Sequence, residues 1–144
     1  MEGKIKYKTV DQVMGGHNGI ETRMGVAYTE AVAKQRASLR RFVDIKSTNA
    51  AKIMGLYPRN GVIAVGSDAD ITIIDPSIRK RLTLDDLHLE DYSIWEGYEI
   101  HGWPVITILR GKAMVEDDNL LGSAGDGQFV KRKIAQEVTM RPVC

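Results

Sequence analysis

The side chains that most often bind metals or transfer protons are few and scattered in this sequence. Its three histidines are His17, His88 and His101, separated by 71 and 13 residues, and its single cysteine is Cys144. They form none of the H-x-H, H-E-x-x-H or C-x-x-C spacings that bring two ligands to one metal ion. Each histidine is therefore expected to lie on the surface or in a loop, and we predict no metal ligand and no catalytic residue among them.

Two other groups combine residue types that could do chemistry. Asp68 and Asp70 form a close pair of carboxylates, as general acid–base catalysis requires. They lie in a polar turn, where we expect Asp68 to hydrogen-bond the backbone two residues on. Ser47 and Thr48 offer hydroxyl groups, yet no base accompanies them, so helix capping is the better interpretation.

The turn around Asp68 joins two short runs of β-branched residues, at 61–65 and 71–75. Gly66 can adopt the positive φ that a tight turn requires, so the pattern predicts a β-hairpin. Pro76 has no N–H to donate to a neighbouring strand and is expected to end the second strand.

Helices are predicted before this hairpin. Ser38 and either Ser47 or Thr48 are the expected N-caps, and Gly55 is an expected stop signal. The helical patterns cover residues 26–36, 39–45 and 49–56.

Strands are predicted after the hairpin. A second hairpin is expected at 105–109 and 113–115 around residues 110–112, and Gly102–Pro104 is expected to interrupt the strand before it. The remaining strands are predicted at 81–84 and 98–101. Helices followed by strands, rather than alternating with them, indicate an α+β fold.

Composition restricts the classes of partner. The chain has 144 residues, which suits one globular domain, and a net charge of +1 from 20 basic and 19 acidic residues. This balance argues against nucleic-acid binding, which requires a basic surface. The sequence contains no apolar segment long enough to span a membrane and no apolar signal-peptide core at its start. We therefore expect no membrane association and a cytoplasmic location.

Four segments resemble, in the same order, motifs of the hydantoinase and dihydropyrimidinase family, the cyclic-amide hydrolases of the amidohydrolase superfamily. They are NGIETR at 18–23, RFVDIKSTNAAKIMGLYP at 41–58, GVIAVGSDADITIID at 61–75 and EGYEIHGWPVITILRG at 96–111. One such motif would be a weak signal, but four in order over nearly the whole length indicate this family.

The resemblance implies a fold. Members of the family carry a (β/α)8 barrel with a β-sandwich beside it. Residues 1–57 then resemble a substrate-type loop and helices from the end of the barrel, and residues 58–121 resemble the C-terminal portion of the sandwich. Residues 122–144 are a tail that either packs on neighbouring subunits or stays free in solvent. The expected fold class is α+β, with short helices from the end of a TIM-type barrel followed by the β-sandwich portion.

The resemblance also implies which chemistry this chain contains. The family binds two divalent metals, typically zinc, through histidines, an aspartate and a carbamylated lysine, all upstream of the matched motifs, so no cofactor is expected in this chain. Asn18 matches an asparagine whose loop binds the amide or imide edge of the substrate ring. The alternative is that Asn18 is only a turn residue before Gly19. Glu21 and Arg23 are expected to form a supporting ion pair beside this loop.

Two functions remain open. The first is the C-terminal part of a metal-dependent cyclic-amide hydrolase that opens hydantoins or dihydropyrimidines and is inactive without the rest of the enzyme. The alternative is a non-catalytic assembly module, like the dihydropyrimidinase-related proteins, or a subunit that docks on a separate barrel chain. In both cases the expected partner is a second copy or a barrel-bearing chain, because uncovered apolar faces and strand edges favour association.

Overall fold

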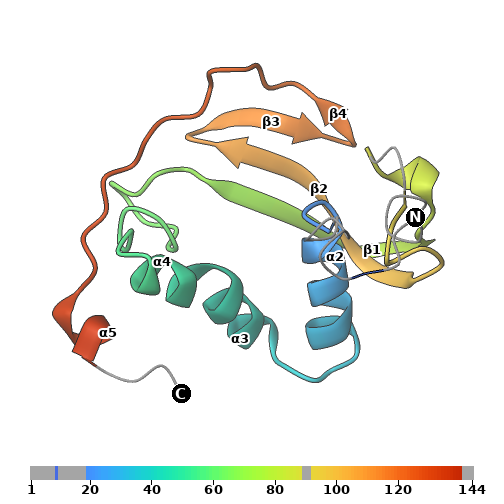
Figure 1. The fold of residues 1–144 in the computed structure, drawn as a ribbon, viewed down its shortest axis with the longest axis horizontal. Helices are drawn as coiled ribbons and strands as arrows, with labels where there is room; N and C mark the ends of the chain where they lie inside the picture. Colours follow the sequence, from blue (N-terminus) through green and yellow to red (C-terminus); the bar gives the residue numbers. More distant parts are fainter. Residues whose placement is uncertain (1–8, 10–18, 89–91, 141–144) are drawn as a thin grey trace.

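The computed structural model describes residue 9 and residues 19–88 and 92–140. Four antiparallel strands form one sheet in the order β1-β2-β3-β4, and α2, α3 and α4 lie below that sheet in Figure 1. The elements are α2 (Arg23–Tyr28), η2 (Thr29–Ala33), α3 (Leu39–Val43), η3 (Asp44–Thr48), α4 (Asn49–Ile53), β1 (Ile71–Arg81), η4 (Leu84–Asp86), β2 (Glu99–Leu109), β3 (Lys112–Glu116), β4 (Asn119–Leu120) and α5 (Gln136–Met140). Helices combined with an antiparallel sheet confirm the α+β expectation at that level.

A hydrophobic core lies where α2 crosses β2. Val26 of α2 packs there with Ile100 and Trp103 of β2. Ile100 is fully buried, and burying a side chain of this size contributes about 1.5–3 kcal/mol relative to leaving it exposed. The cluster is completed by Leu82 and Leu87, with Ile78, Trp95 and Tyr98 packed against it. This core holds α2 against the first half of β2.

Two glycines allow α2 and β2 to approach closely. A Cβ at Gly25 would lie 2.4 Å from the Trp103 ring, and a Cβ at Gly102 would lie 2.5 Å from the Tyr28 ring. Gly102 also has a φ of 93°, a conformation that side chains other than glycine rarely adopt. The helix can therefore lie this close to the strand only with glycine at these two positions.

One buried hydroxyl bonds the same two elements. The Thr29 side chain donates to the carbonyl of Gly25 at 2.8 Å and accepts the backbone N–H of His101 at 3.0 Å. Thr29 is 1% exposed, so without this hydroxyl the His101 amide would lose its partner in a site that water hardly reaches.

The first helical segment is displaced from its predicted bounds. Residues 26–36 were the predicted helix, whereas α2 begins at Arg23 and the π-helical turn η2 ends at Ala33. The early start has a local cause, because the Arg23 amide already donates to the carbonyl of Gly19 at 3.1 Å.

The capping predictions for the next helices have different outcomes. The Ser38 cap of α3 is confirmed, because its hydroxyl accepts the backbone N–H of Arg41 at 3.2 Å. The expected cap at Ser47 or Thr48 is wrong: α3, η3 and α4 follow one another directly, and the Thr48 hydroxyl donates to the carbonyl of Gly61 at 2.8 Å. A hydroxyl used in this way ties the helix to the loop that follows α4.

The hairpin predicted over residues 61–75 is wrong in its first half. Gly66 does adopt a positive φ of 90°, but residues 61–70 contain no strand. The segment bonds other partners, because the Asp68 amide donates to the carbonyl of Arg59 at 2.8 Å and Asp70 accepts the amide of Arg110 at 2.8 Å. The segment therefore joins the end of the helices to the sheet through the Asp68 amide and the Asp70 carboxylate.

The predicted strand ends are also wrong on β1. β1 continues through Pro76 to Arg81, because the register with β2 shifts between Asp75 and Arg79 and leaves Pro76 outside the ladder. The strand predicted at 81–84 is not formed: the chain leaves the sheet after Arg81 and enters η4.

On β2, the prediction that Gly102–Pro104 interrupts the strand is wrong. β2 is continuous from Glu99 to Leu109, with Pro104 beside a second register shift opposite Ile74. Pairing with β1 on both sides of this irregularity keeps the strand in the sheet.

The second predicted hairpin is confirmed. β2 and β3 pair across a turn in which Arg110 and Gly111 have φ of 47° and 81°, as two-residue hairpin turns require. The short β4 had no sequence prediction. Its turn uses Asp117 and Asp118, with φ of 46° and 62°, and aspartate tolerates this conformation without a glycine to mark it.

The segment after β4 is bonded to the rest of the chain over part of its length. The Asp126 carboxylate accepts the Lys112 ammonium at 2.9 Å and the Ser123 amide at 2.7 Å, and the Lys133 amide donates to the carbonyl of Gly55 at 3.0 Å. In Figure 1 this segment passes beside the sheet and returns to the region of α4. The domain boundaries after residues 57 and 121 remain predictions.

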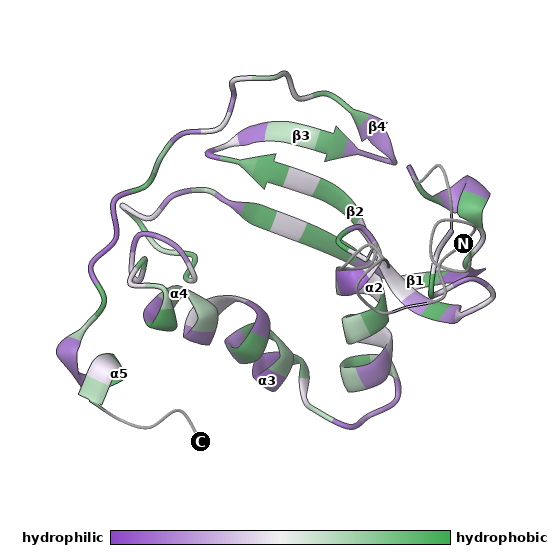
Figure 2. Cartoon of the chain, in the orientation of Figure 1, coloured by the Kyte–Doolittle hydropathy of each residue, from purple (hydrophilic) through white to green (hydrophobic). Residues whose placement is uncertain are grey.

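Hydrophobic residues concentrate along β1 and β2 and alternate with hydrophilic ones on the helices (Figure 2). In the described part of the chain, no helix combines the length and the hydropathy that crossing a membrane requires. The cytoplasmic location remains a sequence prediction.

Candidate functional site

The turn at residues 19–22 leads directly into α2 and is the described part of the predicted substrate loop. Thr22 is fully buried, and its hydroxyl donates to the carbonyl of Gly19 at 3.3 Å. Backbone N–H groups of Arg23 and Val26 donate to Gly19 and Thr22, so the turn and the helix form one bonded unit. The two residues directly before this turn are His17 and Asn18, the predicted substrate-binding residue, and both lie outside the described residues.

A carboxylate from this turn reaches a distant segment. Glu21 accepts the backbone N–H of His88 at 3.0 Å with one oxygen and contacts the His88 Nδ1 at 2.8 Å with the other. The expected ion pair between Glu21 and Arg23 is wrong for these two described residues, because the carboxylate turns toward the end of η4 instead. The hydrogen bond to Glu21 and its charge raise the pKa of His88 above its ordinary 6.5.

A shallow cavity of about 310 Å³ lies against this turn. Ile20 is 84% exposed at its rim, and the Trp95 ring forms part of its wall. The full lining is Gly19, Ile20, Arg23, Val26, Ala27 and Trp95. Apolar side chains beside hydrogen-bonded backbone are a lining that small-molecule sites commonly have.

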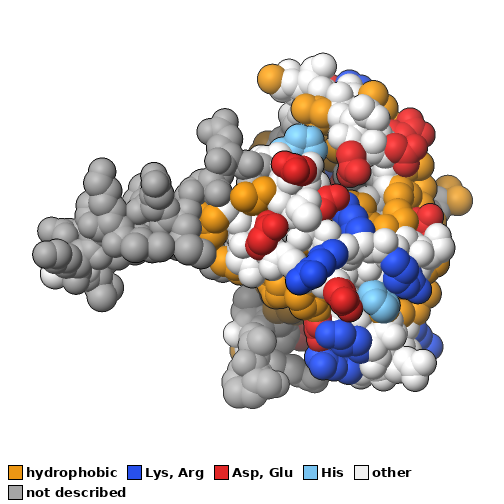
Figure 3. Space-filling view, turned by 90° about the vertical axis from the view of Figure 1, so that its right-hand side faces the viewer, with side chains coloured by type: hydrophobic (Ala, Val, Ile, Leu, Met, Phe, Trp, Pro, Cys, Tyr) orange, Lys and Arg blue, Asp and Glu red, His pale blue; other side chains and the backbone are white. Residues whose placement is uncertain are grey.

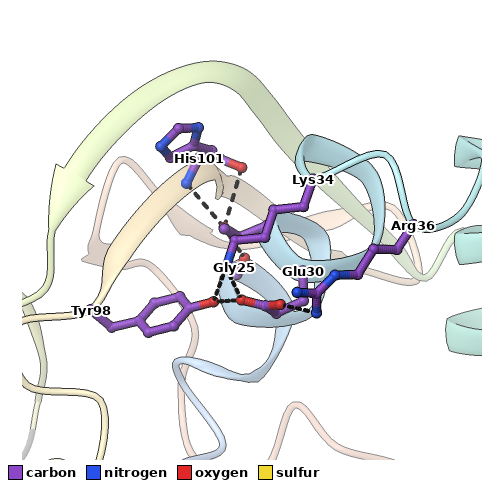
Figure 4. A network of polar contacts seen from close by, with 7 residues as sticks. Gly25, Glu30, Lys34, Arg36, Tyr98 and His101 are labelled. Carbon is purple, nitrogen blue, oxygen red and sulfur yellow. Dashed lines mark hydrogen bonds and ion pairs between the residues drawn. The ribbon is translucent and has the colours of Figure 1, made fainter.

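The far end of the helical segment is held by a polar network (Figure 4). The Glu30 carboxylate accepts hydrogen bonds from the Tyr98 hydroxyl and, at 2.5 Å each, from Lys34 and Arg36. The hydrogen bond from Lys34 is the main reason that the pKa of Glu30 is lowered. Figure 4 shows Tyr98, the residue directly before β2, reaching across to this carboxylate. The network therefore secures η2 to the segment that enters β2, the strand that packs on α2.

The carboxylate pair in the turn of residues 66–70 has a structural use. Asp68 accepts the Arg59 guanidinium at 2.8 Å, and Asp70 accepts the Asn60 side-chain amide at 2.7 Å. The prediction that the Asp68 side chain bonds the backbone two residues on is therefore wrong, because this carboxylate forms an ion pair with Arg59 instead. Asp68 and Asp70 connect two loops and do not form an acid–base pair.

A larger cavity of about 660 Å³ lies between the α3–η3 helices and residues 61–72. Its wall includes Phe42, Val43 and Ile63, together with the Lys46 side chain. Burial, and then the charge of Arg23, lower the pKa of Lys46. The face that Figure 3 turns toward the viewer carries acidic and basic side chains interspersed with hydrophobic ones.

The described residues do not fit the metals that the family resemblance implies. Among residue 9, 19–88 and 92–140, no three His, Cys, Asp or Glu side chains lie together as a metal site requires. His88 is paired with Glu21, whereas His101 lies on β2 with an exposed side chain. No chemical step on this part of the chain is therefore assigned to a metal.

The amidohydrolase family profile matches residues 2–114, most of the chain. The chain belongs to the amidohydrolase family. Among curated relatives, it is 43% identical over 114 residues to the D-hydantoinase of Geobacillus stearothermophilus and 42% identical over 123 residues to the dihydropyrimidinase of Rattus norvegicus. These alignments cover 78% and 85% of the chain but 24% of each relative, so the chain spans about a quarter of their length.

Solved structures agree with this assignment. D-hydantoinase (dihydropyrimidinase) from Thermus sp. superposes with a TM-score of 0.83 at 40% identity, covering 91% of this amidohydrolase chain and 29% of that one. L-hydantoinase (dihydropyrimidinase) from Arthrobacter aurescens gives 0.78 at 37% identity, with 85% and 28% covered. The comparisons thus confirm membership of the amidohydrolase family and similarity to hydantoinases and dihydropyrimidinases.

Sequence reasoning missed the contacts that position the turn of residues 19–22. Glu21 and His88 are 67 residues apart, and the pairs of Thr29 with His101 and of Glu30 with Tyr98 are 72 and 68 apart. No local pattern marks such pairs in a single sequence, because each depends on how η4 and β2 pack beside α2.

Proposed function

We propose that this chain is the C-terminal part of a metal-dependent cyclic-amide hydrolase of the hydantoinase and dihydropyrimidinase kind. The family match over residues 2–114 carries the proposal, and the identity of about 40% to proteins with these names supports the cyclic-amide class of substrate. The reaction is hydrolytic opening of a hydantoin or dihydropyrimidine ring.

The contribution of this chain is binding and support. The turn at 19–22, with Asn18 before it, binds the amide edge of the ring, because neighbouring amide groups offer the paired donor and acceptor that a planar cyclic amide presents. The helices are the end of a TIM-type barrel and the strands are the C-terminal portion of a β-sandwich. The metal ligands come from polypeptide outside this sequence, and the chain has no hydrolytic activity without it.

Fragment complementation tests this proposal. The D-hydantoinase of Geobacillus stearothermophilus, truncated before the quarter that matches this chain, is mixed with the purified chain, zinc and dihydrouracil or a hydantoin. We expect turnover from the mixture and none from either piece alone. Turnover by this chain alone with zinc or manganese would refute the proposal, and so would a stable complex of both pieces that binds zinc but does not turn over.

A Gly25→Val chain is the matched control for the complementation. Its added side chain would collide with the Trp103 ring and displace α2, together with the turn before it. We expect this variant to restore less turnover than the unaltered chain at equal concentration.

A second candidate, a non-catalytic assembly module, is supported by exposed apolar side chains around the larger cavity. Val43 and Ile63 are 47% and 86% exposed there. Surfaces of this kind favour association, either with a barrel-bearing chain or with a second copy. Analytical ultracentrifugation distinguishes the two candidates. If the chain forms an oligomer with itself and does not bind the truncated hydantoinase, the assembly module is favoured.

A further inference from the structure

We propose that the contact between Glu21 and His88 is a latch that holds the turn at residues 19–22 in its binding conformation. The strength of this contact depends on the charge of the His88 imidazole. The part of this inference that concerns substrate rests on the proposed function, whereas the latch itself is a property of this chain.

The first argument is geometric. Both oxygens of Glu21 are engaged by one residue, the first with the backbone N–H of His88 at 3.0 Å and the second with its Nδ1 at 2.8 Å. Two contacts to one carboxylate define its orientation, which a single contact would not. One contact is to backbone and does not depend on the charge of the imidazole, whereas the other gains an ionic component only when the imidazole is protonated.

The second argument is the position of Glu21 in the turn. Thr22 next to it is fully buried and anchored to α2, so that side of the turn is held by packing. Ile20 on its other side is 84% exposed and receives no comparable support from burial. Besides the bonds that close the turn onto α2, the pair with His88 ties the exposed side of the turn to a segment distant in the sequence.

The third argument is the surroundings of His88. Its side chain is 75% exposed, so it exchanges protons freely with solvent. Among residues 19–88 and 92–140, the charges that act on it are Glu21 from the turn and Asp118 from the β3–β4 connection, and both raise its pKa. On its own segment, the Asp86 carboxylate is engaged by Thr83 and by Lys80.

The direction of the pH effect follows from this. A histidine whose pKa is raised in the folded state stabilises that state fully below its ordinary pKa of about 6.5 and loses the contribution as the pH rises through the raised value. The latch is thus strongest in mildly acidic solution and loses its ionic component in alkaline solution.

The first test uses the chain alone and needs no activity. NMR titration should place the pKa of His88 above 6.5, and Glu21→Gln should return it toward that value. The Arg23 amide, which closes the turn on Gly19, should exchange its hydrogen about 2- to 5-fold faster in His88→Gln, after correction for intrinsic exchange. The same acceleration should appear in the unaltered chain above the His88 pKa.

Two variants make this test specific. His101→Gln changes an exposed histidine of β2 and should leave the Arg23 exchange rate unchanged. His88→Lys keeps a positive charge across the pH range and should remove the acceleration at alkaline pH. An unshifted His88 pKa, or equal exchange rates in His88→Gln and the unaltered chain, would overturn the latch regardless of any enzymatic result.

The second test measures kinetics in the complemented hydantoinase. His88→Gln should raise KM for dihydrouracil by about 2- to 5-fold with kcat unchanged, and should flatten the rise of KM with pH that the unaltered chain shows. If the NMR and exchange results are as expected but KM does not change, the latch stands and the proposed contact of this turn with substrate is refuted. The two failures are therefore distinguishable.

Discussion

The close approach of α2 to β2 allows a prediction with a matched control. In Gly102→Ala, the new Cβ would lie 2.5 Å from two atoms of the Tyr28 ring, at a φ of 93°. The backbone strain costs about 1–2 kcal/mol for a residue with a side chain. Crowding against a ring that cannot move freely costs about 1–3 kcal/mol more. We expect the free energy of unfolding to fall by about 2–5 kcal/mol.

Gly66→Ala separates the two causes. Gly66 has nearly the same φ, 90°, but a Cβ there would meet no atom within 4 Å. Only the backbone strain applies, so the expected loss is about 1–2 kcal/mol. The difference between the two losses of unfolding free energy therefore measures the cost of crowding the Tyr28 ring between α2 and β2.

Urea unfolding followed by tryptophan fluorescence is the assay, since Trp103 lies in the core beside this contact. The slopes of the transitions should stay equal, so that midpoints report stability. When Tyr28 is replaced by alanine, the loss of unfolding free energy caused by Gly102→Ala should fall to that caused by Gly66→Ala. A double-mutant cycle separates this effect from the ring contact with Phe42 that Tyr28→Ala also removes. Equal losses for both alanine variants in the unaltered background would refute the reasoning.

Three further predictions concern other contacts of the scaffold. Thr29→Val should lower the free energy of unfolding by about 1–3 kcal/mol, measured by urea unfolding, because it leaves a buried amide of β2 without an acceptor. Gly55→Ala should detach the segment after β4 from the end of α4, since a Cβ there would lie 2.5 Å from the backbone of Lys133. Limited proteolysis of this segment should therefore become faster, and an unchanged cleavage rate would contradict the prediction. The pKa of Asp126 is lowered mainly by its bond to a lysine, so this carboxyl stabilises the fold above its ordinary pKa of 3.8 and ceases to do so as the pH falls through the lowered value. The NMR shift of the Ser123 amide should therefore titrate with a midpoint below 3.8, whereas a midpoint at or above 3.8 would exclude the bond.

The sequence by itself determined the family and the features that depend on neighbouring residues. The Ser38 cap, the stop at Gly55 and the turn at Arg110 and Gly111 each follow from what one or two residues allow their own backbone to do. The motifs, including NGIETR at 18–23, identified the family because four of them occur in order.

Only the tertiary structure decided which distant segments meet. Pro76 lies inside β1 because the register with β2 shifts there, which no local rule predicts. Likewise, Glu21 turns to His88 rather than to Arg23 because packing of α2 on β2 brings the end of η4 beside the turn. Local propensity sets what each segment can form, and the burial of a shared core selects among those possibilities.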